Sequence, residues 1–237
     1  MYHDPLEAPL ICIPPKYLPE LQKLGDDVLS FSKSTAEFLQ SRYTGVVTEA
    51  PLMIHMIKAD LTPALRRLNP ELHAEVTHAM REYFGECSEW TELNATNQLL
   101  QVVAQVSGRA FVGEELCRDP KYISTAINYT VDLMTAVRAV TLVPEWKRWW
   151  AAPRLPEVKR LRQYESDGIE MLRSVIDSRL NAAAADPEYT KPDDIMQWTL
   201  DRLLEQDGKV NAALAAKYQL ILTFAAIHTT TLTATNA

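Results

Sequence analysis

The sequence predicts a mainly helical protein with one short β element near residues 10–13. Nearly half of its 237 residues (47%) are hydrophobic and only seven are glycine, a composition that suits packed helices better than a β-sandwich. Apolar residues recur with helical spacing along most of the chain, whereas the apolar run at 10–13 stops at two prolines, as an edge strand does. The length is enough for one large or two ordinary domains with a sizeable core.

The helices are expected from their start and stop signals. The Asn69-Pro70-Glu71 step combines an N-cap residue, a proline at the first helical position and an acidic first turn. A helix is therefore predicted to begin there and to end at Gly85, which is placed as a C-cap. Further helices fit residues 93–107, 120–140, 155–184, 192–206 and 211–237.

The charge balance and the cysteines weigh against several classes of protein. With a formal net charge of −7, the chain has no broad cationic field, so no nucleic-acid partner is expected. Cys12, Cys87 and Cys117 are odd in number and contain no CxxC pair, which favours a reducing compartment over a disulfide or zinc framework. GxSxG, P-loop and Rossmann glycine patterns are absent, which argues against hydrolases, kinases and dehydrogenases.

Two stretches bear on membranes and targeting. The amino terminus, MYHDPLEAPL, has neither the basic nor the apolar region of a signal peptide. Residues 218–237 form the only uncharged stretch near bilayer length, but they include Gln219, His228 and six threonines, which are costly in lipid. A helix buried in protein is the expected structure there.

Four polar residues at helical spacing resemble half of a metal motif. Glu71, Glu75, His78 and Glu82 share one helix face, and Glu75-x-x-His78 matches the half-motif of a di-iron carboxylate bundle. A complete site needs a second copy, and no other histidine has a glutamate three residues before it. The four residues are therefore predicted to form a solvated face, and no metal site is assigned.

The segment FVGEELC (111–117) has a partial thiolate-loop spacing. Gly113 stands four residues before Cys117, but no glycine stands two residues after the cysteine, and a loop that presents a sulfur to haem iron needs one there. Cys117 is read as structural, followed by a turn into the next helix.

The WKRWW segment (146–150) leaves two alternatives open. Tryptophan and lysine favour the membrane interface, so Trp146–Trp150 could touch a membrane. Equally, the aromatic rings could cap a neighbouring core.

The last predicted helix combines small and hydroxylic residues. Ala225 and Thr229 lie four residues apart on one face, and Ala226 and Thr230 do the same. A small residue one turn before a hydroxyl makes a shallow groove that a flat cofactor can approach. A mid-helix threonine can also bond the carbonyl four residues back. Such helices are more often structural than catalytic.

A family resemblance changes that balance. Residues 225–230, Ala-Ala-Ile-His-Thr-Thr, resemble the oxygen-activating motif of the central I helix in cytochrome P-450 monooxygenases, whose common form is Ala-Gly-x-Asp/Glu-Thr-Thr/Ser. Ala226 replaces the glycine and His228 replaces the acid. The Ala-x-x-His-Thr-Thr version is typical of fungal members resembling ent-kaurene oxidases and other oxidases of terpenoids and related secondary metabolites.

Upstream segments agree with this resemblance in order, so it covers essentially the whole chain. They are IPPKYLPEL (13–21), IHMIKADLTPAL (54–65), SGRAFVGEELCRDPKY (107–122), APRLPEVKRL (152–161) and KPDDIMQWTLD (191–201). The resemblance implies that residues 1–237 are a partial cytochrome P-450 domain that ends in the I helix. The family's haem-ligand cysteine loop would follow residue 237, and its membrane anchor would precede residue 1.

The resemblance also implies a chemistry and its residues. The complete enzyme would bind haem through a cysteine thiolate, take electrons from a flavoprotein reductase and oxidise an apolar, terpenoid-like substrate on the cytoplasmic side of the endoplasmic reticulum membrane. Thr229 would hold water near the reacting oxygen, and His228 would relay or orient protons. The remaining implied contacts are Ala225 and Ala226 with the haem face, His55 and Lys58 with a propionate, and Phe224 and Ile227 with substrate.

Two alternatives remain beside a monooxygenase portion. The chain could be a truncated, inactive remnant of such an enzyme, or an unrelated helical binding module. Because the haem-ligand loop is missing, the 237-residue chain alone is expected to be inactive.

Overall fold

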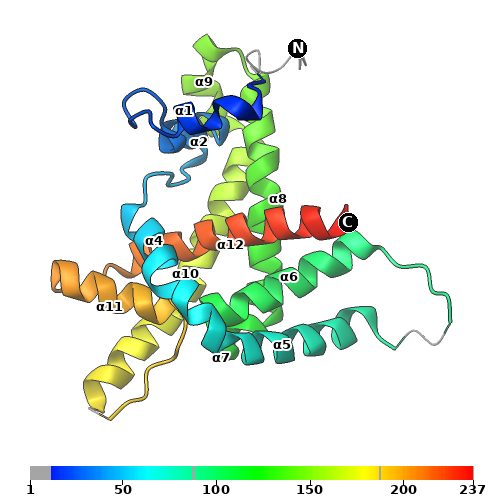
Figure 1. The fold of residues 1–237 in the computed structure, drawn as a ribbon, viewed down its shortest axis with the longest axis vertical. Helices are drawn as coiled ribbons and strands as arrows, with labels where there is room; N and C mark the ends of the chain where they lie inside the picture. The colour runs from blue at the N-terminus through cyan, green and yellow to red at the C-terminus, as the bar shows by residue number, and fades with distance from the viewer. Residues whose placement is uncertain (1–11, 87–88, 187, 237) are drawn as a thin grey trace. The chain divides into compact units, whose positions relative to one another are not determined.

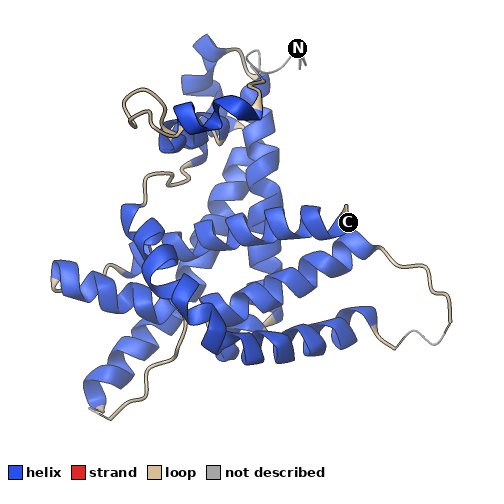
Figure 2. Cartoon of the chain, in the orientation of Figure 1, coloured by secondary structure: helices blue, strands red, loops and turns tan. Residues whose placement is uncertain are grey.

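The computed structural model describes residues 12–86, 89–186 and 188–236, and every regular element within these ranges is helical (Figure 2). The expected β element near 10–13 is not seen. Leu10 and Ile11 lie outside the described residues, and Cys12 and Ile13 have no strand structure. An edge strand needs a partner to supply its backbone hydrogen bonds, and the described residues contain no other strand. The mainly helical fold class is confirmed, and the predicted β element is not seen in the described residues.

The chain divides into two compact units. The first comprises residues 1–49 and 132–162, and the second comprises residues 50–131 and 163–237. The first unit contains η1 (Pro15–Tyr17), α1 (Leu18–Leu21), α2 (Phe31–Phe38), α3 (Ser41–Thr44), α9 (Glu145–Ala151) and η3 (Ala152–Arg154). Long helices α8 (Pro120–Leu142) and α10 (Pro156–Ala185) contribute residues to both units. Within the first unit Leu133, Val140, Val158 and Leu161 are fully buried.

The second unit holds every site residue predicted from the sequence. Its elements are α4 (Pro51–Met56), the π-helical turn η2 (Ile57–Leu61), α5 (Thr62–Phe84), α6 (Ala95–Phe111), α7 (Glu114–Cys117), α11 (Ile195–Asp207) and α12 (Ala212–Thr235), together with parts of α8 and α10. Helix α6 packs against both α5 and α12, and α11 packs against α4 and α12 (Figure 1). Fully buried Leu172, Ile176, Met196, Leu200 and Ile227 form the centre of its core.

The longest predicted helices agree closely with the structure. The segments expected at 155–184 and 211–237 correspond to α10 and α12, and α12 continues through the His-Thr-Thr-Thr step without a break. None of the described helices combines the length and the apolar composition that a bilayer crossing requires.

The predicted start at Asn69 was wrong. Helix α5 begins at Thr62, with Pro63 in its first turn, and continues through Pro70 to Phe84. Pro70 removes one intrahelical hydrogen bond, which is ordinarily costly. The helix continues because one face of it is buried both before the proline, at Ala64 and Leu68, and after it, at Ala79. The predicted end was right, since Gly85 caps the helix with a φ of 69°.

The predicted solvated face on α5 was wrong for Glu75. This residue is 1% exposed, and Arg118 donates to both of its carboxylate oxygens at 3.0 and 2.7 Å. Gln105 of α6 donates to the same carboxylate at 2.6 Å and accepts from the Tyr83 hydroxyl at 2.9 Å. The bonds from Arg118 outweigh burial and lower the pKa of Glu75. A buried acid is tolerated here because α6 and the turn before α8 supply donors.

Candidate functional site

Helix α12 is fixed at its amino-terminal half by polar contacts. The Asn211 side chain caps it by accepting from the backbone N–H of Leu214 at 3.1 Å. The buried Gln219 amide lies between the carbonyl oxygen of Phe111 and the N–H of Met196, at 3.3 and 3.2 Å. Phe111 is the last residue of α6, and Met196 lies in the first turn of α11. Gln219 therefore links α12 to both of these helices.

The carboxyl-terminal half of α12 has two different sides. Leu220, Thr223, Ile227 and Thr231 are buried against the second unit. The opposite side exposes Ala225, Thr229, Thr230, Thr233 and Leu232, all but one of them small or hydroxylic. A backbone beneath such small side chains is open to close approach by a flat group.

Thr229 lies on this exposed side with its hydroxyl engaged. The hydroxyl donates to the carbonyl oxygen of Ala225 at 2.6 Å, the back-bond that the sequence suggested. Thr233 repeats the arrangement one turn later, donating to the Thr229 carbonyl at 2.8 Å. A hydroxyl has one proton and two lone pairs, so Thr229 retains the capacity to accept a hydrogen bond from a molecule on the exposed side.

His228 is held next to Thr229 by an aromatic neighbour. Its ring stacks on that of Phe224, with 5.9 Å between centroids and 12° between planes. Both residues are half-buried. Stacking restricts the imidazole orientation but leaves part of the ring open to proton exchange.

The two remaining site residues of α12 differ in accessibility. Ala226 is partly exposed beside Thr230. Ile227 is completely buried, because two residues correspond to about 200° of rotation and place it opposite Thr229. The structure therefore brings Ala225, Ala226, His228 and Thr229 to one accessible part of the helix, and Ile227 into the core.

His55 and Lys58 lie on α4 and on the π-helical turn η2, and both are exposed. The carbonyl of Ile57 at the start of η2 accepts from both the backbone N–H and the hydroxyl of Thr62, the latter at 2.7 Å. Within the described part of the chain neither His55 nor Lys58 has an ion-pair partner.

His55 lines an open groove of about 490 Å³ that lies near the opposite end of α12 from Thr229. The groove is also lined by Leu203 and Asp207 of α11 and by Leu214 and Tyr218 of α12. Tyr218 lies about 16 Å along the helix axis from Thr229, at 1.5 Å per residue. The structure thus does not place His55 in contact with Thr229.

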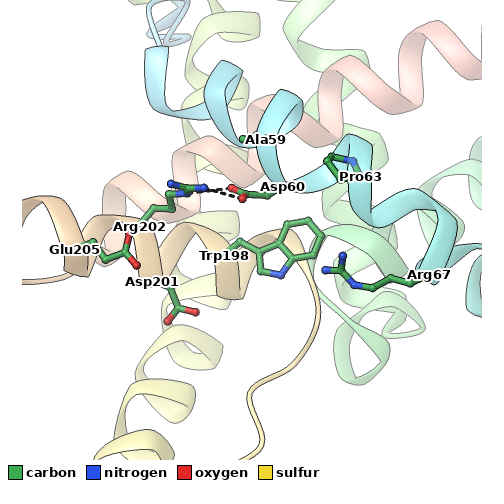
Figure 3. A pocket seen from close by; sticks show the side chains of 8 residues that line it. All are labelled: Ala59, Asp60, Pro63, Arg67, Trp198, Asp201, Arg202 and Glu205. Atoms are coloured by element: carbon green, nitrogen blue, oxygen red, sulfur yellow. Dashed lines mark hydrogen bonds and ion pairs between the residues drawn. The ribbon is translucent and has the colours of Figure 1, made fainter.

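Sequence reasoning missed two arginine–aspartate pairs that join α11 and the residues just before it to η2 and α5. Figure 3 shows one of them, between Arg202 and Asp60. Arg202 donates to both oxygens of Asp60 at 3.1 and 2.7 Å. Arg67 donates to both oxygens of Asp193 at 2.6 and 2.7 Å, and its guanidinium lies 5.4 Å from the Trp198 ring centroid. A signal was present, because the spacing of Asp60 and Arg67 puts them on one helix face.

The pairs flank an open pocket of about 350 Å³ whose lining is mostly charged. Its two guanidinium groups are already engaged by carboxylates, and Figure 3 shows the Arg202–Asp60 pair across the pocket from Arg67. The two ion pairs therefore hold α11 against η2 and α5. Lys58 lies on η2 and His55 on the adjoining α4, so the same pairs help to fix the backbone that carries both residues.

The described cysteines do not provide a haem ligand. Cys117 is completely buried, and burial, reinforced by the Glu75 carboxylate, raises its pKa to about 11, so its sulfur stays protonated. Cys12 is exposed in the first unit, and Cys87 lies outside the described residues. In the described ranges no group of three His, Cys, Asp or Glu residues is spaced to hold a metal ion. The exposed side of α12 suits the face of a flat cofactor, whereas the axial thiolate has no source among the described residues.

Comparison with known proteins identifies the relatives of this chain. The chain matches no protein-family model. Cytochrome P-450 monooxygenase ascG of Acremonium egyptiacum is 31% identical over all of the chain and 45% of its own length. The monooxygenases TES1 of Alternaria alternata and ATR3 of Stachybotrys chlorohalonatus are each 34% identical, over 92% and 96% of the chain. The chain belongs to the cytochrome P-450 monooxygenase family.

The cytochrome P-450 relationship confirms the family resemblance and removes one alternative. An unrelated helical binding module is excluded, because 92–100% of the chain aligns with these three fungal cytochrome P-450 proteins. The chain spans less than half the length of these relatives, between 40% and 47%.

Proposed function

We propose that the chain is the amino-terminal portion of a haem-thiolate monooxygenase that oxidises an apolar, terpenoid-like secondary metabolite. Kinship with fungal cytochrome P-450 monooxygenases over nearly the whole chain supports the reaction class. The observation that carries the assignment of the site is the exposed Ala225–Thr229 step on α12, beside a histidine fixed by stacking. A small residue one turn before a hydroxyl lets a flat cofactor come close to that hydroxyl.

Thr229 acts on protons rather than on the carbon framework of the substrate. Its hydroxyl proton is engaged by the Ala225 carbonyl, so it accepts a hydrogen bond from a water molecule on the exposed side. A rotation of the hydroxyl away from Ala225 turns it into a donor towards a reacting oxygen. Threonine can therefore pass a proton without changing its own charge.

His228 exchanges protons with solvent and supplies them to the water held by Thr229. An imidazole changes charge near neutral pH, so it serves this purpose as the family's usual acid would. Stacking on Phe224 keeps the ring near the exposed side of the helix. Of the two substrate-contact candidates, half-buried Phe224 is better supported than Ile227, which is enclosed by the core.

Haem, when bound, supplies oxygen activation, and a thiolate ligand favours cleavage of the O–O bond. Ala225 and Ala226 would line its face, and His55 and Lys58 would donate to a propionate. Exposure of both donors without an ion-pair partner in the described chain supports this last role. A flavoprotein reductase is the expected electron donor.

A truncated product without turnover is the second candidate. The complete burial of Cys117 favours it for the 237-residue chain taken alone, because a haem iron has no access to the Cys117 sulfur.

The test compares two threonines in a protein that continues beyond residue 237 through the haem-ligand loop. Thr229→Ala is expected to lower product formed per reducing equivalent by about tenfold or more, while substrate affinity changes little, because the groove keeps its shape. Thr233→Ala removes an equivalent back-bond one turn away and is expected to leave that ratio unchanged. Equal ratios in parent and Thr229→Ala would remove Thr229 from proton delivery.

A further inference from the structure

Helix α12 bonds to two other helices through one buried side chain, Gln219, which is 1% exposed. In the amide orientation that satisfies both of its neighbours, Gln219 donates to the carbonyl of Phe111 at 3.3 Å and accepts from the N–H of Met196 at 3.2 Å. Both partners are backbone groups at helix ends, where no bond within the helix is available to them. One amide therefore satisfies a carbonyl of α6 and an N–H of α11 at the same time.

A buried ion pair holds those two helix ends in place. Arg179 of α10 donates to both carboxylate oxygens of Asp194 at 2.8 Å and to the carbonyl of Val112, next to Phe111, at 2.9 Å. Asp194 in turn caps α11 by accepting from the N–H of Gln197 at 2.8 Å. An arginine thus stands at the carboxyl end of α6 and an aspartate at the amino end of α11, each with the charge that the helix dipole favours.

Together these contacts form a closed ring through α6, α10, α11 and α12. The residues of the ring are at most 8% exposed, and they are Phe111, Val112, Arg179, Asp194, Met196 and Gln219. Gly113 allows this close packing, because a Cβ at that position would lie 2.6 Å from an oxygen of Asp194. The ends of α6 and α11 that Gln219 meets are therefore fixed by contacts that do not involve α12.

The apolar residues of α12 do not select one rotation of the helix about its axis. Apart from Lys217, Gln219 and Thr223, residues 212–227 are alanine, leucine, isoleucine, phenylalanine or tyrosine, and they surround the helix on all sides. Hydrophobic burial is non-directional, so several rotations of such a helix would bury similar apolar area. A polar contact is needed to distinguish between them. The Gln219 amide is such a contact, because any other rotation leaves it, the Phe111 carbonyl and the Met196 N–H buried without partners.

We propose that Gln219 is a positioning residue for Thr229, because its amide selects the one rotation of α12 that turns Thr229 to the accessible side. Gln219, Ile227 and Thr231 lie on the same face at multiples of four residues, and all three are buried. Thr229 is two residues from both Ile227 and Thr231, about 200° away around the helix, and it is exposed. A single buried polar side chain fixes the register of coiled coils in the same way. The part that Thr229 takes in proton delivery rests on the proposed function, whereas the rotation of α12 does not.

The experiment measures the rotation of α12 in the 237-residue chain from the reactivity of cysteines introduced at two positions and followed by mass spectrometry of peptides. T229C is expected to react with iodoacetamide about tenfold or more faster than T231C, because Thr229 is exposed and Thr231 is 3% exposed. Q219M keeps the length of the side chain but removes both bonds, and it is expected to reduce this rate ratio to about threefold or less. E75Q is the control and is expected to keep the ratio, because Glu75 is also buried but bonds to α6 and to Arg118.

Far-UV circular dichroism checks that each variant folds, and Q219N, whose side chain is too short to reach both neighbours, replaces Q219M if it does not. An unchanged rate ratio in Q219M overturns the proposal, and so does an equal fall in E75Q, which would indicate a general loss of stability. In the protein that continues through the haem-ligand loop, Q219M is further expected to lower product formed per reducing equivalent by about threefold, with little change in substrate affinity. A fallen rate ratio with unchanged product per reducing equivalent would support the selected rotation and count against the proposed role of Thr229.

Discussion

Two neighbouring aspartates allow a direct test of how burial changes the contribution of an ion pair. Asp194 and Arg179 form a two-point pair at 2.8 Å for both contacts, and their side chains are 1% and 4% exposed. Asp193 and Arg67 form a similar pair at 2.6 and 2.7 Å, but their side chains are 48% and 55% exposed. Both pairs are bidentate arginine–aspartate pairs with similar distances, so accessibility is the main difference.

Arg179→Met is expected to destabilise the chain by about 3–5 kcal/mol, because it leaves a buried carboxylate without its cation. Asp194 would keep only the bond from the N–H of Gln197, at 2.8 Å, and the Val112 carbonyl would lose its donor, now at 2.9 Å. Arg67→Met is expected to cost about 1 kcal/mol, mostly through the screened pair and the contact with Trp198. Adding Asp194→Asn to Arg179→Met removes the stranded charge but keeps an N-cap acceptor, so part of the loss should return.

The assay is equilibrium unfolding in urea followed by far-UV circular dichroism, with unfolding free energies compared at one pH and one salt concentration. Raising the salt should reduce the effect of Arg67→Met and leave that of Arg179→Met nearly unchanged. Equal losses for the two arginine variants would refute the reasoning, as would a double variant less stable than Arg179→Met alone.

Two further predictions concern the buried groups beside α6. The pKa of Glu75 is lowered by the bonds from Arg118, so its contribution is full above the unfolded-state pKa near 4.5 and is lost as pH falls through the folded value. The stability deficit of Glu75→Gln, about 1–3 kcal/mol at neutral pH, should therefore shrink in acid, as urea titrations at several pH values would reveal. Cys117, with a pKa of about 11, carries about one thousandth thiolate at pH 8 and should resist iodoacetamide until urea unfolds the chain, whereas exposed Cys12 reacts at once. Mass spectrometry of peptides would follow both thiols, and comparable rates would contradict the burial of Cys117.

Local patterns predicted the helices more successfully than the polar contacts between them. Helices α10 and α12 were predicted within one or two residues because their apolar periodicity and their caps are local features. The predicted start at Asn69-Pro70 was wrong because the same two residues can also lie inside a longer helix. In α5 the buried residues continue both before and after Pro70. The strand near 10–13 rested on a four-residue apolar run, which is too short to separate strand from irregular chain.

The pairs that fix the second unit join distant segments, which explains why sequence reasoning missed them. Asp60 and Arg202 are 142 positions apart, and Glu75 and Arg118 are 43 apart. Nothing in the residues around Glu75 distinguishes it from its half-exposed neighbours His78 and Glu82. The division into two units was likewise not visible as a linker, because α8 and α10 run through it.

Among the site residues too, contacts within one helix followed from the sequence, whereas packing between helices did not. The back-bond from Thr229 to Ala225 followed from spacing alone, because it lies within one helix. The stacking of Phe224 on His228 also has the four-residue spacing of a helical pair, although it was not predicted. The burial of Ile227 depends on how α12 packs against the rest of the unit, which one helix pattern does not determine.

The most direct test of the central claim is the reduced, carbon-monoxide-treated spectrum of two haem-reconstituted proteins. One is the 237-residue chain, and the other continues from it through the haem-ligand loop. We predict the red-shifted band of a thiolate-ligated haem in the longer protein and its absence in the 237-residue chain, because Cys117 is completely buried and out of reach of a haem iron. A thiolate band in the 237-residue chain that disappears in Cys117→Ser, or no such band in the longer protein, would contradict the account.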